Sequence, residues 1–478
     1  MMDQSKIYQM KRIAHWDTVA KSPKGSFPGS QVYLTSLLEI YQNLVSPGKR
    51  VLELGCGQGD LLAQLQPGFG LGIDFSLEMV KIAKKAHPGC HFICADIHHL
   101  RLKGLFDVII FSDILNDLWD IQRVLGNVQD ACHEDTVILV NFVSRVWELP
   151  LKLMRWLGLS RPNLAQNWLT PRDVRELFDL AGFSFDLHWR EILLPVNIPI
   201  LSDFFNEKIG KLQRINALNL VNFIRFRPSV KKHPEPALGK KVSVVVPVRD
   251  EAGNIHELFK RIPNMGSETE IILVEGHSRD ASEAAIKEEI KANPNSDFYL
   301  LKQPGEGKAD AVFHGLDHAS GDILMILDAD LSFEPELLLR FYDALIQNKG
   351  DVINGVRLVY PMRERAMPYL NLLGNKLFGW VFSIILGQPI RDTLCGTKAF
   401  RKSDYEIMRK ILEKDGLIDP FGDFSLLLCA SKMNLRICQI PIRYHHRTYG
   451  QSKTRPWRDG LKLGHLLVKF LTHRTKYD

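Results

Sequence analysis

The chain has 478 residues, of which 45% are hydrophobic and 24% are charged, and this composition excludes collagen-like, disordered and disulfide-scaffold proteins. At about 100–200 residues per domain, the length predicts two to four domains. The net charge of +6 is too small to indicate a nucleic-acid partner. Residues 431–478, however, hold eleven Lys or Arg and two Asp, so the basic excess belongs to the C-terminal segment.

The cysteines and the uncharged segments indicate where the protein is located. Seven cysteines, an odd number at low density, indicate reduced thiols and a cytoplasmic protein. The N-terminal residues MMDQSKIYQMKRIAHW contain no apolar signal segment. The uncharged apolar runs 377–390 and 192–202 fall short of the roughly 18–20 residues that span a bilayer. We therefore expect no transmembrane helix and only a peripheral contact with the cytosolic face of a membrane.

Strand-like apolar runs alternate with helical patterns in two parts of the chain. The expected strands of the first part are 51–54, 70–73, 91–94, 108–111 and 137–142. A polar, proline-containing run at 229–241 is expected to be a linker. The expected strands of the second part are 242–246, 270–274, 298–301 and 323–327. This alternation predicts an α/β fold with two doubly wound, Rossmann-like domains in series, residues 1–228 and 242–478.

A glycine-rich turn follows the first expected strand in VLELGCGQGDLL (51–62). Its glycines, which let the backbone approach a ligand closely, are Gly55, Gly57 and Gly59. Asp74 ends the next strand, where an acid is placed to accept hydrogen bonds from both hydroxyls of a ribose. Glu53 and Asp60 put a carboxylate on each side of the turn, which disfavours a pyrophosphate and suits a ligand with a cationic end.

These segments resemble class I S-adenosylmethionine-dependent methyltransferases over about residues 12–190. The matching motifs are ELGCGQG (53–59), GIDFS (72–76), ADI (95–97), FDVIIFSD (106–113) and LTPRDVRELFDLAGF (169–183). The resemblance implies that S-adenosylmethionine is the cofactor, with Asp74 on its ribose, Asp96 near its adenine and the Gly55–Gly59 loop beside its methionine part. We count Glu53 with these cofactor-binding residues.

The resemblance names no catalytic residue in this domain. The family has none at a fixed position, because a sulfonium is already a strong electrophile and positioning supplies much of the rate. Asp113, Asn116 and Asp117 face the expected site, with a surface-loop role as the alternative for each. The alternative for the whole domain is a non-catalytic module that binds the cofactor or its product, or that tethers or stabilises its neighbour.

Two carboxylates, Asp328 and Asp330, follow the apolar run 323–327. Oxygen ligands of this kind suit Mg²⁺ or Mn²⁺, and such a metal neutralises the charge of a departing nucleotide diphosphate. The alternative is that both acids cap a following helix. Polar residues also follow the first two expected strands of this part, in the segments 246–255 and 275–281. The carboxyl ends of parallel strands meet at one edge of a sheet, where ligands bind. That coincidence favours the metal and diphosphate site.

This second part resembles inverting, family 2 glycosyltransferases of the GT-A type, and within them dolichol-phosphate mannose synthase and its bacterial polyprenyl-phosphate relatives. The matching motifs are PVRDEAGNI (247–255), GEGKADAV (305–312), ASGDILMILDADL (319–331), RDTLCGTKAFR (391–401), FGDFSLL (421–427) and RTYGQSKT (447–454). They cover about residues 240–460. The resemblance implies a nucleotide-sugar donor, a divalent metal and a polyprenyl-phosphate acceptor.

The resemblance also implies which residues hold the donor. Three acids, Glu251, Glu275 and Asp280, would surround the base and ribose. Lys308 would lie near the nucleotide, and Asp328 and Asp330 would lie at the metal and diphosphate. The motif VEGHSRD (274–280) departs from the family's usual VDDGSxD, because Glu275 replaces the first acid and Gly276 lacks the second. The identity of the nucleotide, uridine or guanosine, therefore stays open.

The acceptor decides which chemistry is needed. A lipid phosphate is already a nucleophile at pH 7, whereas a sugar hydroxyl needs a general base. Asp423 aligns with the family's base position, and with a phosphate acceptor it would orient groups rather than abstract a proton. Cations for an anionic acceptor are expected among Arg357, Arg391, Arg447 and Lys453, the last two inside a matching motif. Arg363 and Arg365 are expected on a loop that closes over the donor.

Two segments concern membrane contact. Residues 375–390 predict either a buried core helix or an interfacial helix that touches lipid. Residues 460–470 predict a short basic amphipathic helix, with a purely solvated charged face as the alternative. Nucleic acid is not expected as a partner, because no stacking aromatics or recognition motif accompany the basic residues.

Together the motifs predict a bifunctional enzyme. Its C-terminal half would transfer a sugar, with inversion and a divalent metal, from a nucleotide-sugar to polyprenyl or dolichyl phosphate. Its N-terminal half would transfer a methyl group to an unidentified acceptor. The alternative is a glycosyltransferase that acts on a glycan or protein hydroxyl, with Asp423 as the base and the first domain non-catalytic.

Overall fold

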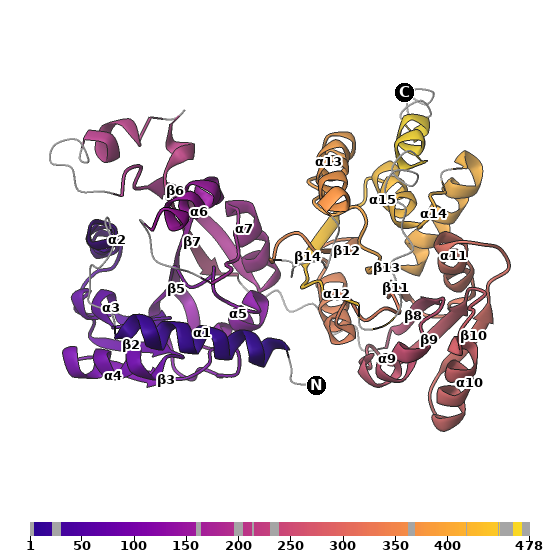
Figure 1. Ribbon diagram of the computed structural model, residues 1–478, viewed down its shortest axis with the longest axis horizontal. Helices are drawn as coiled ribbons and strands as arrows, with labels where there is room; N and C mark the ends of the chain where they lie inside the picture. The colour runs from indigo at the N-terminus through magenta and orange to yellow at the C-terminus, as the bar shows by residue number, and fades with distance from the viewer. Residues whose placement is uncertain are drawn as a thin grey trace. The chain divides into compact units, whose positions relative to one another are not determined.

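A computed structural model describes residues 4–21, 30–158, 164–195, 204–212, 215–229, 239–361, 369–416, 418–447, 449 and 462–470. The chain divides into two compact units, Met1–Lys231 and Lys232–Asp478. Each unit is built on a seven-stranded sheet with helices packed on it (Figure 1). The two expected Rossmann-like α/β domains in series are thereby confirmed. Most of the expected linker lies outside the described residues.

The sheet of the first unit has the strand order β3-β2-β1-β4-β5-β7-β6. Its strands are β1 (Arg50–Leu54), β2 (Phe69–Asp74), β3 (His91–Cys94), β4 (Phe106–Ser112), β5 (Cys132–Val143), β6 (Phe183–Glu191) and β7 (Val221–Pro228). The first five pair in parallel, and β7 runs antiparallel to both of its neighbours. All five strands expected in this unit are present, whereas β6 and β7 carry more polar residues and were not predicted.

Two helices precede the first strand of this unit, and the other helices lie between strands along the chain. They are α1 (Gln4–Ala20), α2 (Ser30–Leu44), α3 (Asp60–Gln64), α4 (Leu77–Ala86), α5 (Ile121–Gln129), α6 (Glu148–Trp156) and α7 (Pro171–Leu180), with short turns η1 (Arg145–Trp147), η2 (Phe204–Ile209) and η3 (Asn216–Leu218). Local chemistry explains where they begin. In α7, for example, Thr170 and Asp173 form a capping box and Pro171 occupies the first turn.

The sheet of the second unit has the order β10-β9-β8-β11-β13-β12-β14. Its strands are β8 (Lys241–Val248), β9 (Glu268–Glu275), β10 (Phe298–Lys302), β11 (Ile323–Ile326), β12 (Val352–Val356), β13 (Lys398–Arg401) and β14 (Ile437–Pro441). Only β13 runs antiparallel to its neighbours. The helical elements are η4 (Ala252–Asn254), α9 (Ile255–Arg261), α10 (Ser282–Ala292), α11 (Lys308–His318), η5 (Pro335–Leu337), α12 (Leu338–Ile346), α13 (Tyr369–Leu386), α14 (Lys402–Asp415) and α15 (Asp423–Lys432).

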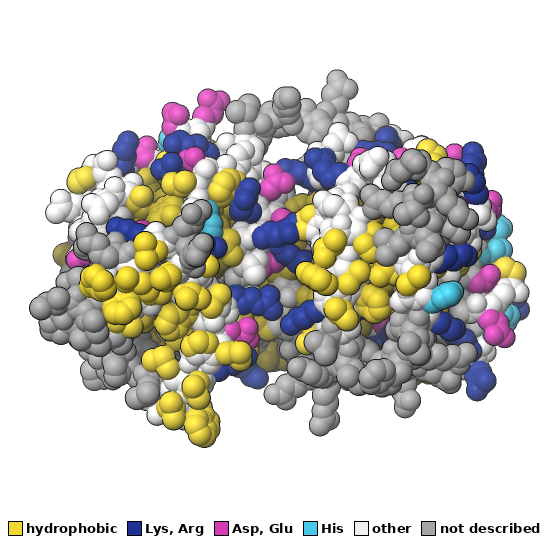
Figure 2. All heavy atoms as spheres, turned by 90° about the horizontal axis from the view of Figure 1, so that it is seen from above, with side chains coloured by type: hydrophobic (Ala, Val, Ile, Leu, Met, Phe, Trp, Pro, Cys, Tyr) yellow, Lys and Arg dark blue, Asp and Glu magenta, His cyan; other side chains and the backbone are white. Residues whose placement is uncertain are grey.

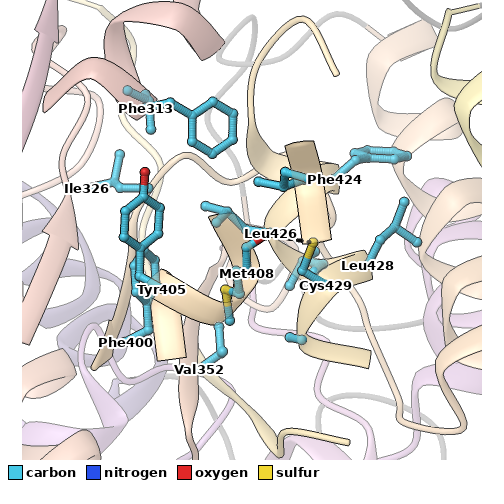
Figure 3. Close-up of a cluster of buried hydrophobic side chains, with 14 of the residues drawn as sticks. Phe313, Ile326, Val352, Phe400, Tyr405, Met408, Phe424, Leu426, Leu428 and Cys429 are labelled. Atoms are coloured by element: carbon cyan, nitrogen blue, oxygen red, sulfur yellow. Dashed lines mark hydrogen bonds between the residues drawn. The ribbon is translucent and has the colours of Figure 1, made fainter. Parts of the chain in front are cut away.

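The core of the second unit surrounds α15, which is buried from its first residue through Ala430. Figure 3 shows Met408 of α14 and Cys429 of α15 among the aromatic rings of Phe400, Tyr405 and Phe424. The Cys429 thiol donates to the Met408 carbonyl oxygen at 3.8 Å. Because close-packed interiors resist displacement, this core holds the N-terminus of α15 in place.

Residues 462–470 form the expected helix, and its apolar side packs against that same core. Leu463, Leu466 and Phe470 are all buried. In α13, Phe382 is buried while Leu377, Trp380 and Ile384 are exposed, so one side of the helix is packed in the core; contact of the other side with lipid stays a prediction. No helix in the described part of the chain is long and apolar enough to cross a membrane.

Candidate active sites

In the first unit, the glycine turn after β1 lies against Asp74 at the end of β2. Gly57 N donates to Asp74 Oδ2 at 2.9 Å, and Ser76 N donates to Asp74 Oδ1 at 2.8 Å. All three glycines of the turn have positive φ, a conformation that L side chains rarely adopt. A Cβ built on Gly57 would meet no atom within 4 Å. The turn therefore borders open space beside the Asp74 carboxylate.

Glu53 is a buried acid next to this turn. Its side chain is 3% exposed, and Oε2 finds no hydrogen-bond partner among the described residues. Burial raises the pKa of Glu53 to about 8; a backbone hydrogen bond from Leu62 opposes the shift, and the carboxylates of Asp74 and Asp60 add to it. Buried polar atoms are normally paired, so an orphaned carboxyl oxygen suits a cationic group of a ligand.

Asp96 lies beyond the end of β3 and is held by two histidines. His98 N donates to Asp96 Oδ1 at 3.0 Å, and the imidazole Nδ1 atoms of His98 and His99 lie 2.8 and 2.5 Å from the carboxylate oxygens. Burial raises the pKa of Asp96, but the hydrogen bonds from His98 outweigh burial and hold the pKa below its usual range. The carboxylate is thus fixed in its ionised form, and its place near an adenine stays a prediction.

The acids after β4 tie the N-terminal helices to the same edge. Asp113 accepts from Tyr33 OH at 2.7 Å and from Asn141 Nδ2 at 2.8 Å. Asp117 accepts from Trp16 Nε1 at 3.1 Å. These contacts give the two carboxylates an anchoring role, and the aromatic residues that reach them from α1 and α2 were not predicted. No local sequence pattern predicts these aromatic contacts, because the paired residues lie about 80–100 positions apart in the sequence.

In the second unit, Asp328 and Asp330 follow β11 and each contacts a cation. Lys308 Nζ lies 2.5 Å from Asp328 Oδ1, and the guanidinium Nη2 of Arg447 lies 2.9 Å from Asp330 Oδ2. Ser332 N donates to Asp330 Oδ1 at 3.0 Å. The helical turn that follows starts only at Pro335, so neither acid caps a helix. Burial raises the pKa of Asp328, but Lys308 outweighs burial and lowers it.

Asp423 lies near the same lysine. Its Oδ2 is 4.0 Å from Lys308 Nζ, and its Oδ1 is 3.3 Å from Nζ of Lys398. Burial raises the pKa of Asp423, although both lysines oppose the shift. Lys398 is fully buried and also donates to the Cys395 carbonyl oxygen. Sequence reasoning missed Lys398; the signal was a lysine inside the apolar strand KAFR, because a buried lysine requires an anionic partner.

The three acids expected at the donor lie in or beside the loops that follow β8 and β9. Asp280 Oδ2 accepts from Ala252 N at 3.1 Å, and Glu275 Oε1 accepts from Ser278 N at 2.6 Å. Glu251 N donates to Ser282 Oγ at 2.8 Å. The carboxylates of Asp280 and Glu275 thus organise the backbone of these loops, whereas the Glu251 carboxylate accepts from Asn254 Nδ2 at 2.7 Å.

Two further residues beside the acids expected at the donor were not predicted as site residues. Tyr449 OH donates to Asp280 Oδ2 at 3.3 Å, and its ring lies against Gly253. A Cβ built on Gly276 would lie 2.7 Å from Gln303 Oε1, so the Gln303 amide fills the space beside the missing second acid. The Gln303 amide also donates to the Gly307 carbonyl oxygen at 2.7 Å.

The predicted cations lie in different surroundings. The Arg357 guanidinium forms a bidentate pair with Asp392, with distances of 2.7 and 2.8 Å, so it contacts a carboxylate of its own unit. Arg391 donates its backbone N–H to Gln439 Oε1 at 2.8 Å. Lys453, Arg363 and Arg365 lie outside the described residues. Among the predicted cations, Lys308 and Arg447 therefore form ion pairs with Asp328 and Asp330, and Arg357 lies close enough to help lower the pKa of Asp328.

The Asp392→Asn substitution tests the buried pair. Asp392 is fully buried, and Arg357 lowers its pKa against the opposing effect of burial. Because the change leaves the guanidinium without its counter-charge, we expect a loss of about 3–5 kcal/mol in the free energy of unfolding of the C-terminal unit, measured by urea denaturation. Glu283→Gln, which removes exposed pairs with Lys287 and Lys302, should leave the free energy of unfolding nearly unchanged. Equal losses for the two variants would contradict the assignment.

Comparisons with known proteins give a family match in each unit. A family model described as a methyltransferase domain matches residues 45–182, and one described as glycosyl transferase family 2 matches residues 243–415. The undecaprenyl-phosphate 4-deoxy-4-formamido-L-arabinose transferase of Edwardsiella ictaluri is 28% identical over 216 residues. That match covers 44% of this chain and 62% of the relative, so the chain spans less than two thirds of the relative's length.

Solved structures with similar folds include methyltransferases. One is a chain of the complex between the Haloferax volcanii Trm112 methyltransferase activator and the putative methyltransferase. It is 16% identical to this chain with a TM-score of 0.35, and the match covers 45% of this chain and 97% of that chain. Another is magnesium protoporphyrin IX methyltransferase from Synechocystis, with 17% identity, a TM-score of 0.30, and 42% and 84% covered. The family matches confirm that a methyltransferase domain is followed by a family 2 glycosyltransferase domain.

Proposed function

We propose that the C-terminal unit transfers a sugar, with inversion, from a nucleoside diphosphate sugar to a polyprenyl or dolichyl phosphate. The observation that carries the proposal is the group formed by Asp328, Asp330, Lys308 and Arg447 at the carboxyl edge of the sheet. It places two cations and two carboxylates at one point, as binding of a diphosphate and its metal requires. The similarity to a relative named for undecaprenyl phosphate supports the lipid acceptor.

A divalent metal fits this edge as a partner of the donor. The described residues contain no group of three His, Cys, Asp or Glu side chains that would hold a metal by themselves. Mg²⁺ is commonly held by one or two carboxylates together with substrate phosphates and water. Asp328 and Asp330 would supply those carboxylates, and the metal would neutralise charge on the leaving diphosphate. Lys308, already in contact with Asp328, would add a further positive charge.

The acceptor phosphate would meet Arg447 and, from the same motif, Lys453. Arg447 has its pKa raised above its usual value, because Asp330 and other nearby anions outweigh burial, so it stays cationic in the site. Asp423 would orient groups through Lys308 and Lys398 rather than take a proton. Its raised pKa instead favours the alternative, a hydroxyl acceptor with Asp423 as the base, because a catalytic base works best with a pKa near neutrality.

A transfer assay separates the two acceptors. The full-length protein is incubated with Mg²⁺, a panel of nucleotide sugars and short-chain polyprenyl phosphate, and the lipid is analysed by mass spectrometry. A product whose mass has increased by one sugar supports the proposal. The matched control is the same polyprenol without its phosphate. Transfer to the polyprenol, or transfer only to a glycan or a protein, would overturn the phosphate-acceptor assignment.

For the N-terminal unit, we propose methyl transfer from S-adenosylmethionine to an acceptor that is not identified. When bound, this cofactor supplies an activated methyl group on a sulfonium. The residues of the unit fit it: Asp74 at the end of β2 holds the glycine turn, a Cβ on Gly57 would meet only open space, and the orphaned Glu53 oxygen suits a cationic group. Asp96, oriented by His98, would lie near the adenine. Gly55, Gly57 and Gly59 would let the chain pass close to the methionine part.

Glu53 makes the stability of this unit depend on pH. Its folded pKa of about 8 is above the ordinary value of 4.5, so between these values the folded unit holds a proton that the unfolded chain has released. The free energy of unfolding should therefore fall as the pH rises through this window, by up to about 1.4 kcal/mol per pH unit. We expect the Tm of the cofactor-free protein to fall between pH 5.5 and 8 relative to Glu53→Gln. Parallel curves for the two proteins would contradict the assignment.

We also propose a peripheral membrane contact for the C-terminal unit. Leu377, Trp380 and Ile384 are exposed at successive turns of α13, next to the exposed Lys376. A helix with an apolar side, a tryptophan and a flanking base is typical of the membrane–water interface. Helix 462–470 contributes less than its sequence pattern suggests, because its leucines are packed in the core.

A further inference from the structure

The outer side of α6 in the N-terminal unit is apolar over its whole length. Leu149, Leu153 and Trp156 are 75%, 56% and 81% exposed, and their spacing places them on one side of the helix. Val146 and Leu157 extend this row at the two ends, with 55% and 54% exposure. We call these five residues the α6 face. The solvent side of a helix is normally polar, and a contiguous exposed apolar surface indicates an interaction site.

The fold of the unit does not require this face to be apolar. The opposite side of the segment is already packed, because Trp147 and Leu151 lie against the buried core. The Trp147 indole donates to the Leu218 carbonyl oxygen at 2.7 Å, which fixes η1 and α6 to the η3 turn. Burial of the inner side therefore accounts for the position of α6, and the apolar outer side needs a different explanation.

The segment between β6 and β7, which meets η1 through Leu218, also exposes apolar side chains. Leu218, whose carbonyl Trp147 contacts, is 50% exposed, and Phe204 and Leu212 of this segment are 51% and 52% exposed. Figure 2 shows hydrophobic side chains gathered on the N-terminal unit, at the left of the view. Exposed apolar side chains of this unit are thus not confined to α6.

Basic residues border the α6 face. The run Arg145–Trp156 contains Arg145, Lys152 and Arg155 but a single acid, Glu148, which pairs with Lys152 at 2.7 Å. The net charge of this run is therefore +2. Leucines beside a largely exposed tryptophan, with basic side chains at the border, match the surface of a bilayer that contains anionic lipids.

We propose that the α6 face docks the N-terminal unit onto an anionic lipid bilayer. The apolar side chains would enter the boundary between headgroups and acyl chains, and Arg145 and Arg155 would lie at the level of the phosphates. This contact is separate from the one proposed for α13, because it lies in the other unit and uses different residues.

The position of the face indicates a class of methyl acceptor, an inference that rests on the proposed methyl transfer. The turn η1 begins two residues after β5 ends, at the carboxyl edge that also carries Gly57 and Asp74. Docking through α6 would bring this edge toward the membrane surface. The acceptor would then be a molecule that resides in the bilayer, such as a lipid with a polar headgroup, rather than a freely diffusing metabolite.

The test is a vesicle-binding measurement on the full-length protein, without any substrate. Vesicles of phosphatidylcholine with phosphatidylglycerol are compared with vesicles of phosphatidylcholine alone by co-sedimentation at low and high salt. The variant Leu149→Ser/Leu153→Ser/Trp156→Ser should bind anionic vesicles about tenfold or more weakly than the wild type, because three exposed apolar side chains are lost. Leu105→Ser/Leu187→Ser, which also removes exposed apolar side chains from this unit, should bind within about twofold of the wild type.

Two further variants keep the result interpretable. Trp156→Ser alone, at an exposed position, should lower binding severalfold with an unchanged Tm, which controls for misfolding of the triple variant. Leu377→Ser/Trp380→Ser/Ile384→Ser reports the α13 contact separately. Wild-type binding by the α6 variant would overturn the proposal. So would a wild-type dimer that the α6 substitutions dissociate while vesicle binding is unchanged, because the face would then bind a second copy. Since no turnover is measured, failure of either proposed activity leaves this test unaffected.

Discussion

Replacing Asp328 with Asn is expected to reduce sugar transfer by about a thousandfold or more, with saturating Mg²⁺ unable to restore it. The carboxylate lies 2.5 Å from Lys308 Nζ, and it is one of the two acids that would hold the metal on the donor diphosphate. The amide keeps the shape of the side chain but removes the negative charge that Lys308 and the metal require. The rate is measured as lipid-linked sugar formed under the conditions of the transfer assay.

The matched control is Asp322→Asn, at the opposite end of the same strand. Asp322 Oδ2 accepts a hydrogen bond from Lys241 N at 3.1 Å, away from the carboxyl edge. This variant should transfer sugar within about twofold of the wild type, since an exposed side chain remote from the site rarely affects activity. Undiminished transfer by Asp328→Asn would refute the role given to Asp328.

Replacing Asp74 with Asn is expected to weaken binding of S-adenosylmethionine by about a hundredfold, as measured by calorimetry. A carboxylate accepts two ribose hydroxyls in charge-assisted hydrogen bonds, each of which contributes about 1.5–3 kcal/mol. Asp74 is also the acceptor for Gly57 N, so the substitution loosens the turn that borders the cofactor.

Asp107→Asn serves as the control for this variant. Asp107 accepts from Arg50 N at 2.8 Å, at the amino end of β1 and therefore at the edge remote from the glycine turn. Its affinity for the cofactor should equal that of the wild type. If the wild-type protein itself binds no S-adenosylmethionine, the methyl-transfer proposal fails and the domain is a cofactor-free module. Tight binding by Asp74→Asn would refute only the role of this residue.

Much of the fold could be predicted because its signals are local. A parallel strand buried on both faces is a continuous apolar run, so 51–54 and 242–246 were recognisable without any tertiary information. The antiparallel β7 and its neighbour β6 were missed because they carry charged residues at partly exposed positions, which weakens the apolar signal. Their pairing joins residues about 30–45 positions apart, a distance at which a local pattern carries no information.

The two candidate sites show the same division. The sequence alone determined where the motifs lie that are predicted to carry chemistry, namely the glycine turn with Asp74 and the pair Asp328 and Asp330. Each motif follows a strand whose carboxyl end forms the expected ligand edge. It could not show that Arg357 contacts Asp392, or that Lys398 lies against Asp423. Those pairings arise only when the strands and helices pack, since a buried charge must find an opposite charge wherever the fold brings one.

Tertiary structure also decided what the amphipathic helices face. The sequence pattern of 460–470 suggested a surface helix, yet its leucines complete the core of the C-terminal unit. In α6, by contrast, the core is already satisfied by Trp147 and Leu151, and Trp156 is left in solvent. A helical pattern specifies that an apolar side exists. Which surface covers that side depends on the space that the rest of the fold leaves open, and only the packed structure determines that space.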